Sequence, residues 1–240
     1  MTRAAVIARR ELGSYFYSPI AYVAMTLFLI ATGLAFGRDF RPGQVVAMRS
    51  LLEWMVFFMV GIIPILTMGL LAQEWSSGTI ETLMTAPVGE TEVVLGKFLG
   101  SLGFFLVLLC PTVLYAALMA IYSTPGFDFG PVVCGYLGMV LVGALFIAIG
   151  LFCSSLTRLQ MVAAVVAASV LTLITVVPWV VTQRATLSPF WRGFMDQLVF
   201  RRYADFSKGM LDTGHVVFFL AMTGVFLFLT VKVLESRRWR

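Results

Sequence analysis

The chain has 240 residues, of which 60% are apolar and only 12% are charged, and its formal net charge is +5. A soluble domain usually carries roughly 25% charged residues. Apolar surface of this extent is unfavourable in water, because exposed apolar area costs free energy in proportion to its size. The composition therefore excludes an ordinary soluble protein. It also makes nucleic-acid binding a poor explanation of the positive charge, which we assign to the membrane surface.

Six stretches contain no Asp, Glu, Lys or Arg, and they are 19 to 30 residues long. A helix needs about 20 apolar residues to cross a bilayer, and it satisfies its own backbone hydrogen bonds there. We therefore predict an all-α integral membrane protein with six transmembrane helices in a single domain, residues 1–240. The predicted spans lie near residues 18–37, 54–73, 98–121, 131–153, 160–182 and 214–232.

Residues 2–17 precede the first span and predict an interfacial helix. An apolar face and a basic face occur at helical spacing, as expected for a helix in the headgroup plane. The apolar face comprises Ala5, Ala8, Leu12, Tyr15 and Phe16, and Ile7 departs from it. The helix is either a plain membrane anchor or a contact for a partner. We expect the first span to be retained rather than cleaved as a signal peptide.

Six spans place both termini on one side of the membrane. The basic residues number nine on that side and eight on the other, which barely decides the orientation. The basic residues next to the first and last spans favour termini in the cytoplasm. We therefore predict a multi-pass membrane protein with both termini cytoplasmic.

The chain contains no obvious catalytic or cofactor site. His215 is the only histidine, so a histidine-based triad or metal site has little to draw on. The three cysteines all fall within spans and are interpreted as packing residues. Gly96-Lys97 lacks the remainder of a phosphate-binding loop. We predict a protein that is not an enzyme and binds no cofactor itself.

The spans also contain few ionisable groups, which ion-coupled carriers usually keep at membrane depth. Glu53 and Asp128 lie at span edges. Pro64, Pro111 and Pro178 lie within spans and are expected to kink them. An ion-coupled secondary carrier is therefore disfavoured, although helix breaks with free carbonyls leave it open.

Residues 74–90 form a long polar connection between the second and third spans. Their apolar positions recur at helical spacing and predict a short amphipathic helix. These positions are Ile80, Leu83 and Met84. Gly78 suits the start of this helix and Pro87 its end. The physical pattern fits a docking element or a solvated loop equally well.

The third span begins with two features of its own. Glu90 and Glu92 lie where negative charge suits the helix dipole. Gly96 and Gly100 form a GxxxG pair, which permits close contact between helices in lipid. These glycines would allow another helix to approach the third span closely.

The connection and the start of the third span together carry a longer pattern. It comprises Glu74, Gly78, Thr79, Glu81, Leu83, Pro87, Glu92, Gly96 and Lys97. This pattern resembles the signature of ABC-2 type transporter permeases, E-x-x-x-G-T-x-E-x-L-x-x-x-P followed by an acidic residue and G-K. The span arrangement is similar too, which implies the ABC-2 type permease fold. The resemblance is closest to the branch of the gliding-motility-associated and nitrous-oxide-maturation permeases.

The resemblance implies a membrane subunit that works as a dimer, most simply a homodimer, above a dimer of separate ATPase subunits. ATP and magnesium would bind those subunits only, and an extracytoplasmic accessory protein would be a further partner. The connection would be a coupling hairpin, with apolar residues in a groove of the ATPase and Glu74 and Glu81 pairing with basic groups. The implied coupling residues are Glu74, Gly78, Thr79, Ile80, Glu81, Leu83, Met84 and Pro87. The turn at Arg158 would be a second cytoplasmic contact.

Residues 183–213 form the long connection on the opposite side. Phe190, Phe194 and Leu198 recur every four residues and predict one short helix. A second short helix is predicted from Phe206, Met210 and Leu211. The resemblance implies an extracytoplasmic gate formed by Phe190, Phe194, Leu198 and Phe206. Passive anchoring by aromatic and basic residues is the alternative.

The fifth span contains small residues that permit close backbone approach. They include Ala163, Ala164, Ala167 and Ala168. These residues pack either across a dimer interface or within one chain.

Three functions follow from the sequence. The leading one is the membrane subunit of an ATP-driven exporter or force-transmitting machine. The others are a membrane anchor or assembly subunit without transport activity, and an ion-coupled carrier. The cargo is not specified by any charge cluster in the spans.

Overall fold

The structure is a computed structural model, and it describes residues 3–39, 48–78, 89–122, 128–182 and 198–238. Every regular element within these residues is a helix. In chain order they are α1 (Arg3–Tyr17), α2 (Pro19–Asp39), α3 (Met48–Thr67), α4 (Gly69–Ser77), α6 (Glu90–Leu109), the 3-10 turn η1 (Cys110–Thr112), α7 (Val113–Tyr122), α8 (Phe129–Leu156), α9 (Gln160–Thr182), α11 (Val199–Ser207) and α12 (Thr213–Arg238).

Six stretches of helix are long and apolar enough to cross a membrane, which confirms the predicted all-α fold with six spans. They are Pro19–Arg38, Met48–Ser77, Glu90–Tyr122, Phe129–Leu156, Gln160–Val181 and Thr213–Ser236. Two of them extend well beyond the stretches expected from sequence. The second continues through α4, and the third runs through α6, η1 and α7.

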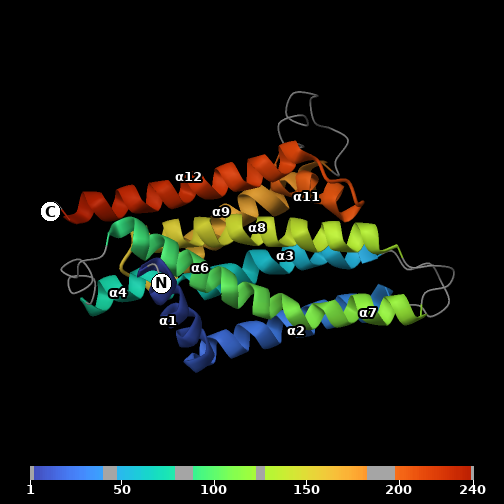
Figure 1. Cartoon of the computed structure of the whole chain (residues 1–240), viewed down its shortest axis with the longest axis horizontal. Helices are drawn as coiled ribbons and strands as arrows, with labels where there is room; N and C mark the ends of the chain where they lie inside the picture. Colours follow the sequence, from blue (N-terminus) through green and yellow to red (C-terminus); the bar gives the residue numbers. More distant parts are fainter. Residues whose placement is uncertain (1–2, 40–47, 79–88, 123–127, 183–197, 239–240) are drawn as a thin grey trace.

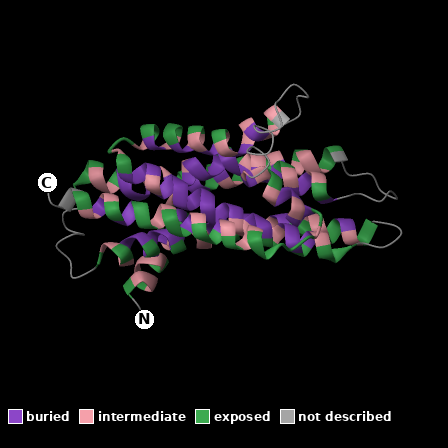
Figure 2. Ribbon diagram, turned by 90° about the horizontal axis from the view of Figure 1, so that it is seen from above, coloured by how far each residue is buried: buried purple, intermediate pink, exposed green. Residues whose placement is uncertain are grey.

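The long helix α8 forms the centre of the bundle. In its most apolar stretch 67% of the residues are buried, against 22% in the corresponding stretches of α2 and α12. Helices α3, α6, α9, α11 and α12 all contact α8. Close approach is possible because α8 presents glycines to its neighbours: Gly138 faces Phe206 and Gly143 faces Phe105. Figure 2 shows the buried residues concentrated along the central helices.

Two prolines coincide with breaks in the spans. Pro64 lies within α3, which ends at Thr67 before α4 begins at Gly69. Pro111 lies in η1, where α6 passes into α7 through a short 3-10 turn. Proline removes a backbone donor and crowds the preceding turn, so these breaks follow from the residues. Pro178, by contrast, lies inside the continuous helix α9.

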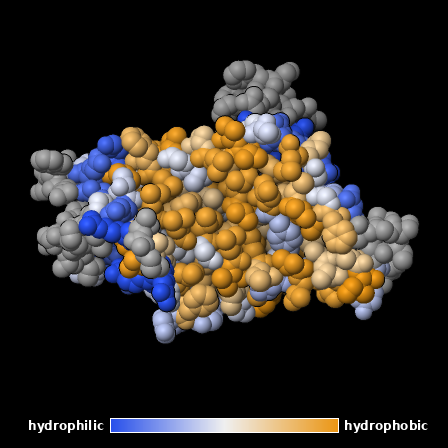
Figure 3. Space-filling view, in the orientation of Figure 1, coloured by the Kyte–Doolittle hydropathy of each residue, from blue (hydrophilic) through white to orange (hydrophobic). Residues whose placement is uncertain are grey.

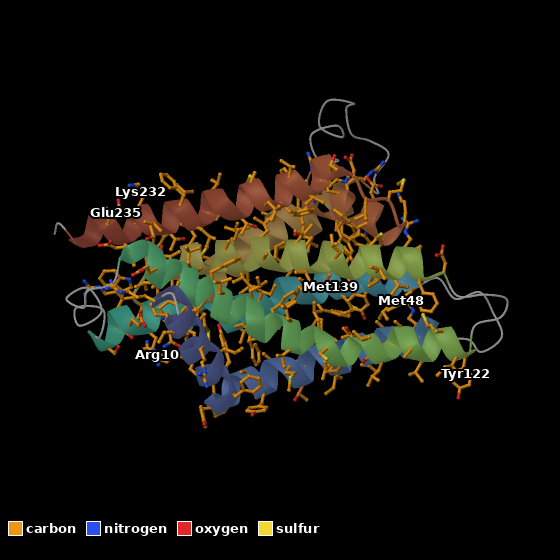
Figure 4. The ribbon with its side chains drawn as sticks, viewed as in Figure 1. Arg10, Met48, Tyr122, Met139, Lys232 and Glu235 are labelled. Atoms are coloured by element: carbon orange, nitrogen blue, oxygen red, sulfur yellow. The ribbon has the colours of Figure 1, made fainter. Side chains whose placement is uncertain are left out.

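Both termini lie at the same end of the bundle, together with α4, the start of α6 and the turn between α8 and α9 (Figure 1). We call this the terminal end. A broad apolar belt covers the middle of the molecule, and hydrophilic residues gather toward its ends (Figure 3). Figure 4 places Arg10, Lys232 and Glu235 at the terminal end, with Met48 and Tyr122 at the other. This distribution is the one expected of a protein that spans a bilayer.

Candidate functional site

The ion-pair cluster of the terminal end joins three helices through one lysine. Lys97 of α6 is only 2% exposed. Its Nζ lies 2.8 Å from Oε1 of Glu11 in α1 and 2.7 Å from Oε1 of Glu74 in α4. The two carboxylates are also largely shielded, with side chains 12% and 17% exposed. We call Glu11, Lys97 and Glu74 the charge clamp.

The energetics of the charge clamp are those of buried ions. Removing charges from water is costly, and only close partners with good geometry offset that cost. Arg10 lies 3.8 Å from Glu11, but its side chain is 67% exposed, so solvent screens this contact. Glu74 was expected to reach a basic group of an ATPase. Within this chain, the structure pairs its carboxylate with Lys97, and the contact with an ATPase stays a prediction.

The crossing of α1 over α6 brings Glu11 to Lys97. A Cβ atom on Gly96 would lie 2.6 Å from Cβ of Ile7, and one on Gly100 would lie 2.9 Å from the backbone oxygen of Ala8. Only glycine tolerates such close approach. The helix that crosses the GxxxG pair is therefore α1 of the same chain.

The face of α1 that contacts α6 differs from the predicted apolar stripe. Ile7, which departed from that stripe, packs on Gly96, and Glu11 is buried opposite Gly100. Phe16, predicted to belong to the stripe, is 43% exposed. The prediction assigned Glu11 to neither face, and the structure pairs it with Lys97 against α6.

Tyr15 fixes the same crossing one turn further along α1. Its hydroxyl donates to the backbone oxygen of Leu66 at 3.0 Å and hydrogen-bonds with Ser101 at 3.0 Å. Its ring stacks on Phe104 with the centroids 4.7 Å apart. Burial raises the pKa of Tyr15 well above its ordinary value; the Glu11 charge adds to this effect and the Ser101 hydrogen bond opposes it. The tyrosine is therefore a neutral hydrogen-bonding group that joins α1 to α3 and α6.

The junction between α3 and α4 is held by a serine of the central helix. The Ser154 hydroxyl accepts hydrogen bonds from the backbone N–H groups of Leu71 (3.1 Å) and Ala72 (3.0 Å). It donates to the backbone oxygen of Met68 at 2.9 Å. These backbone groups lie where the helix breaks, and unpaired buried groups would be costly. One hydroxyl therefore fixes the position of α4 relative to α8.

The coupling residues predicted from sequence fall mostly outside the described residues. Those outside are Thr79, Ile80, Glu81, Leu83, Met84 and Pro87. Gly78 is described, and it caps the C-terminal end of α4 with a left-handed φ of 71°. Helix α4 continues the second span to Ser77, and glycine is the residue that best ends it. The helix that Gly78 was expected to start lies outside the described residues, so that expectation stays a prediction.

The turn between α8 and α9 lies at the same end of the bundle. Arg158 is exposed there, as a surface contact requires. Its neighbour Thr157 accepts a hydrogen bond at 3.1 Å from the backbone N–H of Leu159, which shapes the turn.

In α9 the small residues divide into two faces. Ala163 and Ala167 are each 1% exposed within the single chain, whereas Ala164 and Ala168 lie partly at the surface.

The predicted gate residues at the opposite end are only partly described. Phe190 and Phe194 lie outside the described residues, and Leu198 directly precedes α11. Phe206 is fully buried, with its Cβ 2.8 Å from the position of a Cβ on Gly138. The second short helix is shorter than predicted. It ends at Ser207, Gly209 follows with φ of 84°, and Met210 and Leu211 are more than half exposed.

Sequence reasoning assigned no role to Glu11 or Ser154. It placed Tyr15 only in an apolar face and named Lys97 only as part of the signature pattern. A signal for the charge clamp was present in the pattern of charges. Glu11, Glu74 and Lys97 each directly border a charge-free stretch, and they carry opposite signs. Charges at the same membrane depth on neighbouring spans are candidates for pairing. Among the described residues, no group of three or more His, Cys, Asp or Glu is arranged to hold a metal ion.

The fold and the terminal end define a class of protein: a multi-pass, all-α membrane protein with polar elements clustered at one end of its spans. The sequence model of the ABC-2 family transporter protein matches residues 5–198. The chain therefore belongs to the ABC-2 transporter family, as a membrane permease subunit of an ABC transporter. Members of this family are membrane transport components that in general associate with an ABC ATPase. A comparison with curated protein sequences finds no match.

Proposed function

We propose that this chain couples ATP hydrolysis by a separate ATPase subunit to export or force transmission across a bacterial inner membrane. Residues 74–87 receive the motion of the ATPase, and the spans respond. In this proposal both termini and the whole terminal end face the cytoplasm. ATP and magnesium bind the ATPase partner, and the permease works as a homodimer.

The charge clamp is the observation that carries the proposal. Residues 79–88 connect the end of α4 to the start of α6, and Glu74 and Lys97 lie on these two helices. Their 2.7 Å ion pair joins both ends of the connection, and Glu11 adds α1 to the same unit. A force applied to residues 79–88 is thereby passed to three helices together. Coupling requires such a linked element with two positions, one for each state of the ATPase.

The Ser154 hydrogen bonds extend this unit into the bundle. They tie α4 to α8, the central helix that most other spans contact. Movement of α4 therefore displaces the core rather than a peripheral helix. Phe206 packs on α8 near its other end, which gives the proposed extracytoplasmic gate a physical connection to the same helix. An accessory protein would bind on that outer side.

The test is co-purification of the tagged chain with its ATPase, followed by measurement of ATPase activity. Glu81→Lys places a positive charge where a carboxylate is proposed to pair with the ATPase, so we expect association to weaken by about tenfold or more. Glu235→Lys is the matched control. It reverses an exposed charge at the terminal end, in α12, away from the connection.

The outcomes separate the functions. Loss of the complex in Glu81→Lys, with the control unchanged, supports coupling. An unchanged complex and ATPase rate in Glu81→Lys contradicts the coupling assignment and favours a membrane anchor. Transport by the chain without any ATPase, driven by an ion gradient, would contradict the proposal in favour of a secondary carrier.

A further inference from the structure

A cavity of ≈ 700 Å³ lies at the terminal end beside the charge clamp. Its walls come from α1, the start of α2, the α3–α4 junction and the start of α9. Carboxylates, hydroxyls and amides line one part: Glu11, Ser14, Gln73, Glu74, Ser77 and Gln160. Aliphatic side chains, including Ile20, Ile65 and Leu70, line another. A cavity with polar and apolar parts fits an amphiphilic ligand.

The net charge of the residues that line the cavity indicates which headgroup the ligand has. The ionised groups among its lining residues are Glu11, Glu74 and Lys97, which carry two negative charges and one positive charge. The lysine is already engaged by both carboxylates. Oε2 of Glu74 is buried and has no hydrogen-bond partner. A buried acceptor without a donor is unfavourable, so a cationic donor is the complement that this site lacks.

The hydroxyl groups point to the same chemistry. Ser14 donates its proton to the backbone oxygen of Glu11 at 2.7 Å, and Ser77 donates to that of Gln73 at 2.9 Å. Ser14 is exposed and lines the cavity, so its hydroxyl oxygen, whose proton is already donated, is left as an acceptor for a ligand. A primary ammonium carries three N–H donors and satisfies several such acceptors at once. A quaternary ammonium carries none, and a phosphate offers only further acceptors and negative charge.

The surroundings of the cavity match the membrane interface. Ile20 is 47% exposed, and Tyr17 is 91% exposed at the bend between α1 and α2. Exposed tyrosines of this kind lie at headgroup depth. An amphiphile held in the bilayer could therefore place its head among the carboxylates and its chain along the aliphatic wall.

We propose that this cavity binds the primary ammonium head of a membrane amphiphile, with the phosphatidylethanolamine headgroup as its source. The ammonium donates to the carboxylate of Glu74 and to the hydroxyl oxygen of Ser14, which both line the cavity. The ammonium group of the bound head places a positive charge beside the two carboxylates of the charge clamp. The site is independent of whether the coupling assignment holds, because it needs only the permease itself.

The experiment is native mass spectrometry of the purified full-length chain in detergent. The protein is incubated with an equimolar mixture of phosphatidylethanolamine, phosphatidylcholine and phosphatidylglycerol with identical acyl chains. We expect retained phosphatidylethanolamine adducts to exceed each of the others by about tenfold, the effect of one charge-assisted hydrogen bond. Dodecylamine and free ethanolamine are added as competitors. Displacement by dodecylamine identifies the ammonium amphiphile as the shared ligand chemistry.

Two variants test the residues. Glu74→Gln removes the excess negative charge and should abolish the preference for phosphatidylethanolamine. Ser14→Phe fills the cavity from an exposed position, so it leaves the charge clamp intact and should remove the adduct. Glu235→Gln alters an exposed carboxylate of α12 and should change nothing. Equal retention of the three lipids, preference for phosphatidylglycerol, or an unchanged adduct in Ser14→Phe would overturn the proposal.

Discussion

The ammonium group of Lys97 lies 2.7 Å from the carboxylate of Glu74, and this contact joins the two helices that flank residues 79–88. The same ammonium group pairs with Glu11, so α1 belongs to the unit as well. A lysine that is 2% exposed has no solvent to replace a lost partner. The charge clamp is therefore the contact whose removal most directly tests how the terminal end is built.

Lys97→Met should destabilise the chain strongly, because it leaves two shielded carboxylates without their cation. We expect the free energy of unfolding to fall by about 3–5 kcal/mol. Reversible unfolding in mixed detergent micelles measures it. Lys232→Met is the control, because Lys232 pairs with Glu235 at the surface, and its loss should cost at most about 1 kcal/mol. Equal losses in the two variants would contradict a buried clamp.

Replacing Gly100 by Ala should separate α1 from α6. The new methyl group would lie 2.7 Å from Cβ of Glu11 and 2.9 Å from the backbone oxygen of Ala8, and the backbone cannot yield as a side chain can. We expect a loss of about 1–3 kcal/mol. At Gly103, on the same helix, a Cβ would meet only Leu12 at 3.5 Å. Gly103→Ala should therefore be neutral or stabilise the protein by up to about 1 kcal/mol. The reverse order of stability would contradict the observed crossing.

Ser154→Ala should weaken the junction between α3 and α4. The substitution removes the acceptor of the Leu71 and Ala72 backbone N–H groups at a buried position. The expected loss is about 1–3 kcal/mol of unfolding free energy for each group left unpaired. Ser169→Ala is the matched control, because Ser169 is exposed and only donates within its own helix. Thermal unfolding of both variants in one detergent compares them, and similar melting temperatures would argue against the junction.

The dimer proposal predicts a difference between neighbouring positions of α9. After Cys110, which is exposed, is replaced by Ser, Ala164→Cys should form a crosslinked dimer on oxidation. Ala163→Cys should not, because Ala163 is 1% exposed within a single chain. Non-reducing gel electrophoresis of membranes reads out the result. Crosslinking that is absent at both Ala164 and Ala168 would count against a dimer through this helix.

Tyr15 predicts a pH dependence of stability. Burial raises the pKa of its hydroxyl, so the folded state favours the neutral form. This contribution is fully present below the unfolded-state pKa of about 10 and is lost as the pH rises above it. The wild type should therefore lose stability more steeply than Tyr15→Phe as pH rises above about 10. Tyr17→Phe, altered at a tyrosine that is 91% exposed, should behave like the wild type. If the free energy of unfolding depended on pH equally in all three proteins, burial of Tyr15 would be contradicted.

The number of spans followed from the charge-free stretches alone, because lipid excludes unpaired charges and admits helices of one minimum length. The GxxxG pair likewise indicated that a helix could approach closely, although not which helix does so. The pair Met210 and Leu211 was assigned wrongly. Local spacing could not show that α4 is a continuation of the second span or that α11 ends at Ser207.

The sequence by itself determined that this is an integral membrane protein. The free energy of moving apolar and charged residues between water and lipid decides which composition and charge spacing a membrane span has, and both can be read without the fold. Its signature residues also indicated the family. Only the tertiary structure decided which charges meet. Glu11, Glu74 and Lys97 are separated by up to 86 residues, and their pairing depends on α1 crossing α6 at Gly96 and Gly100. Such a crossing is set by packing between distant segments, and no local pattern specifies it.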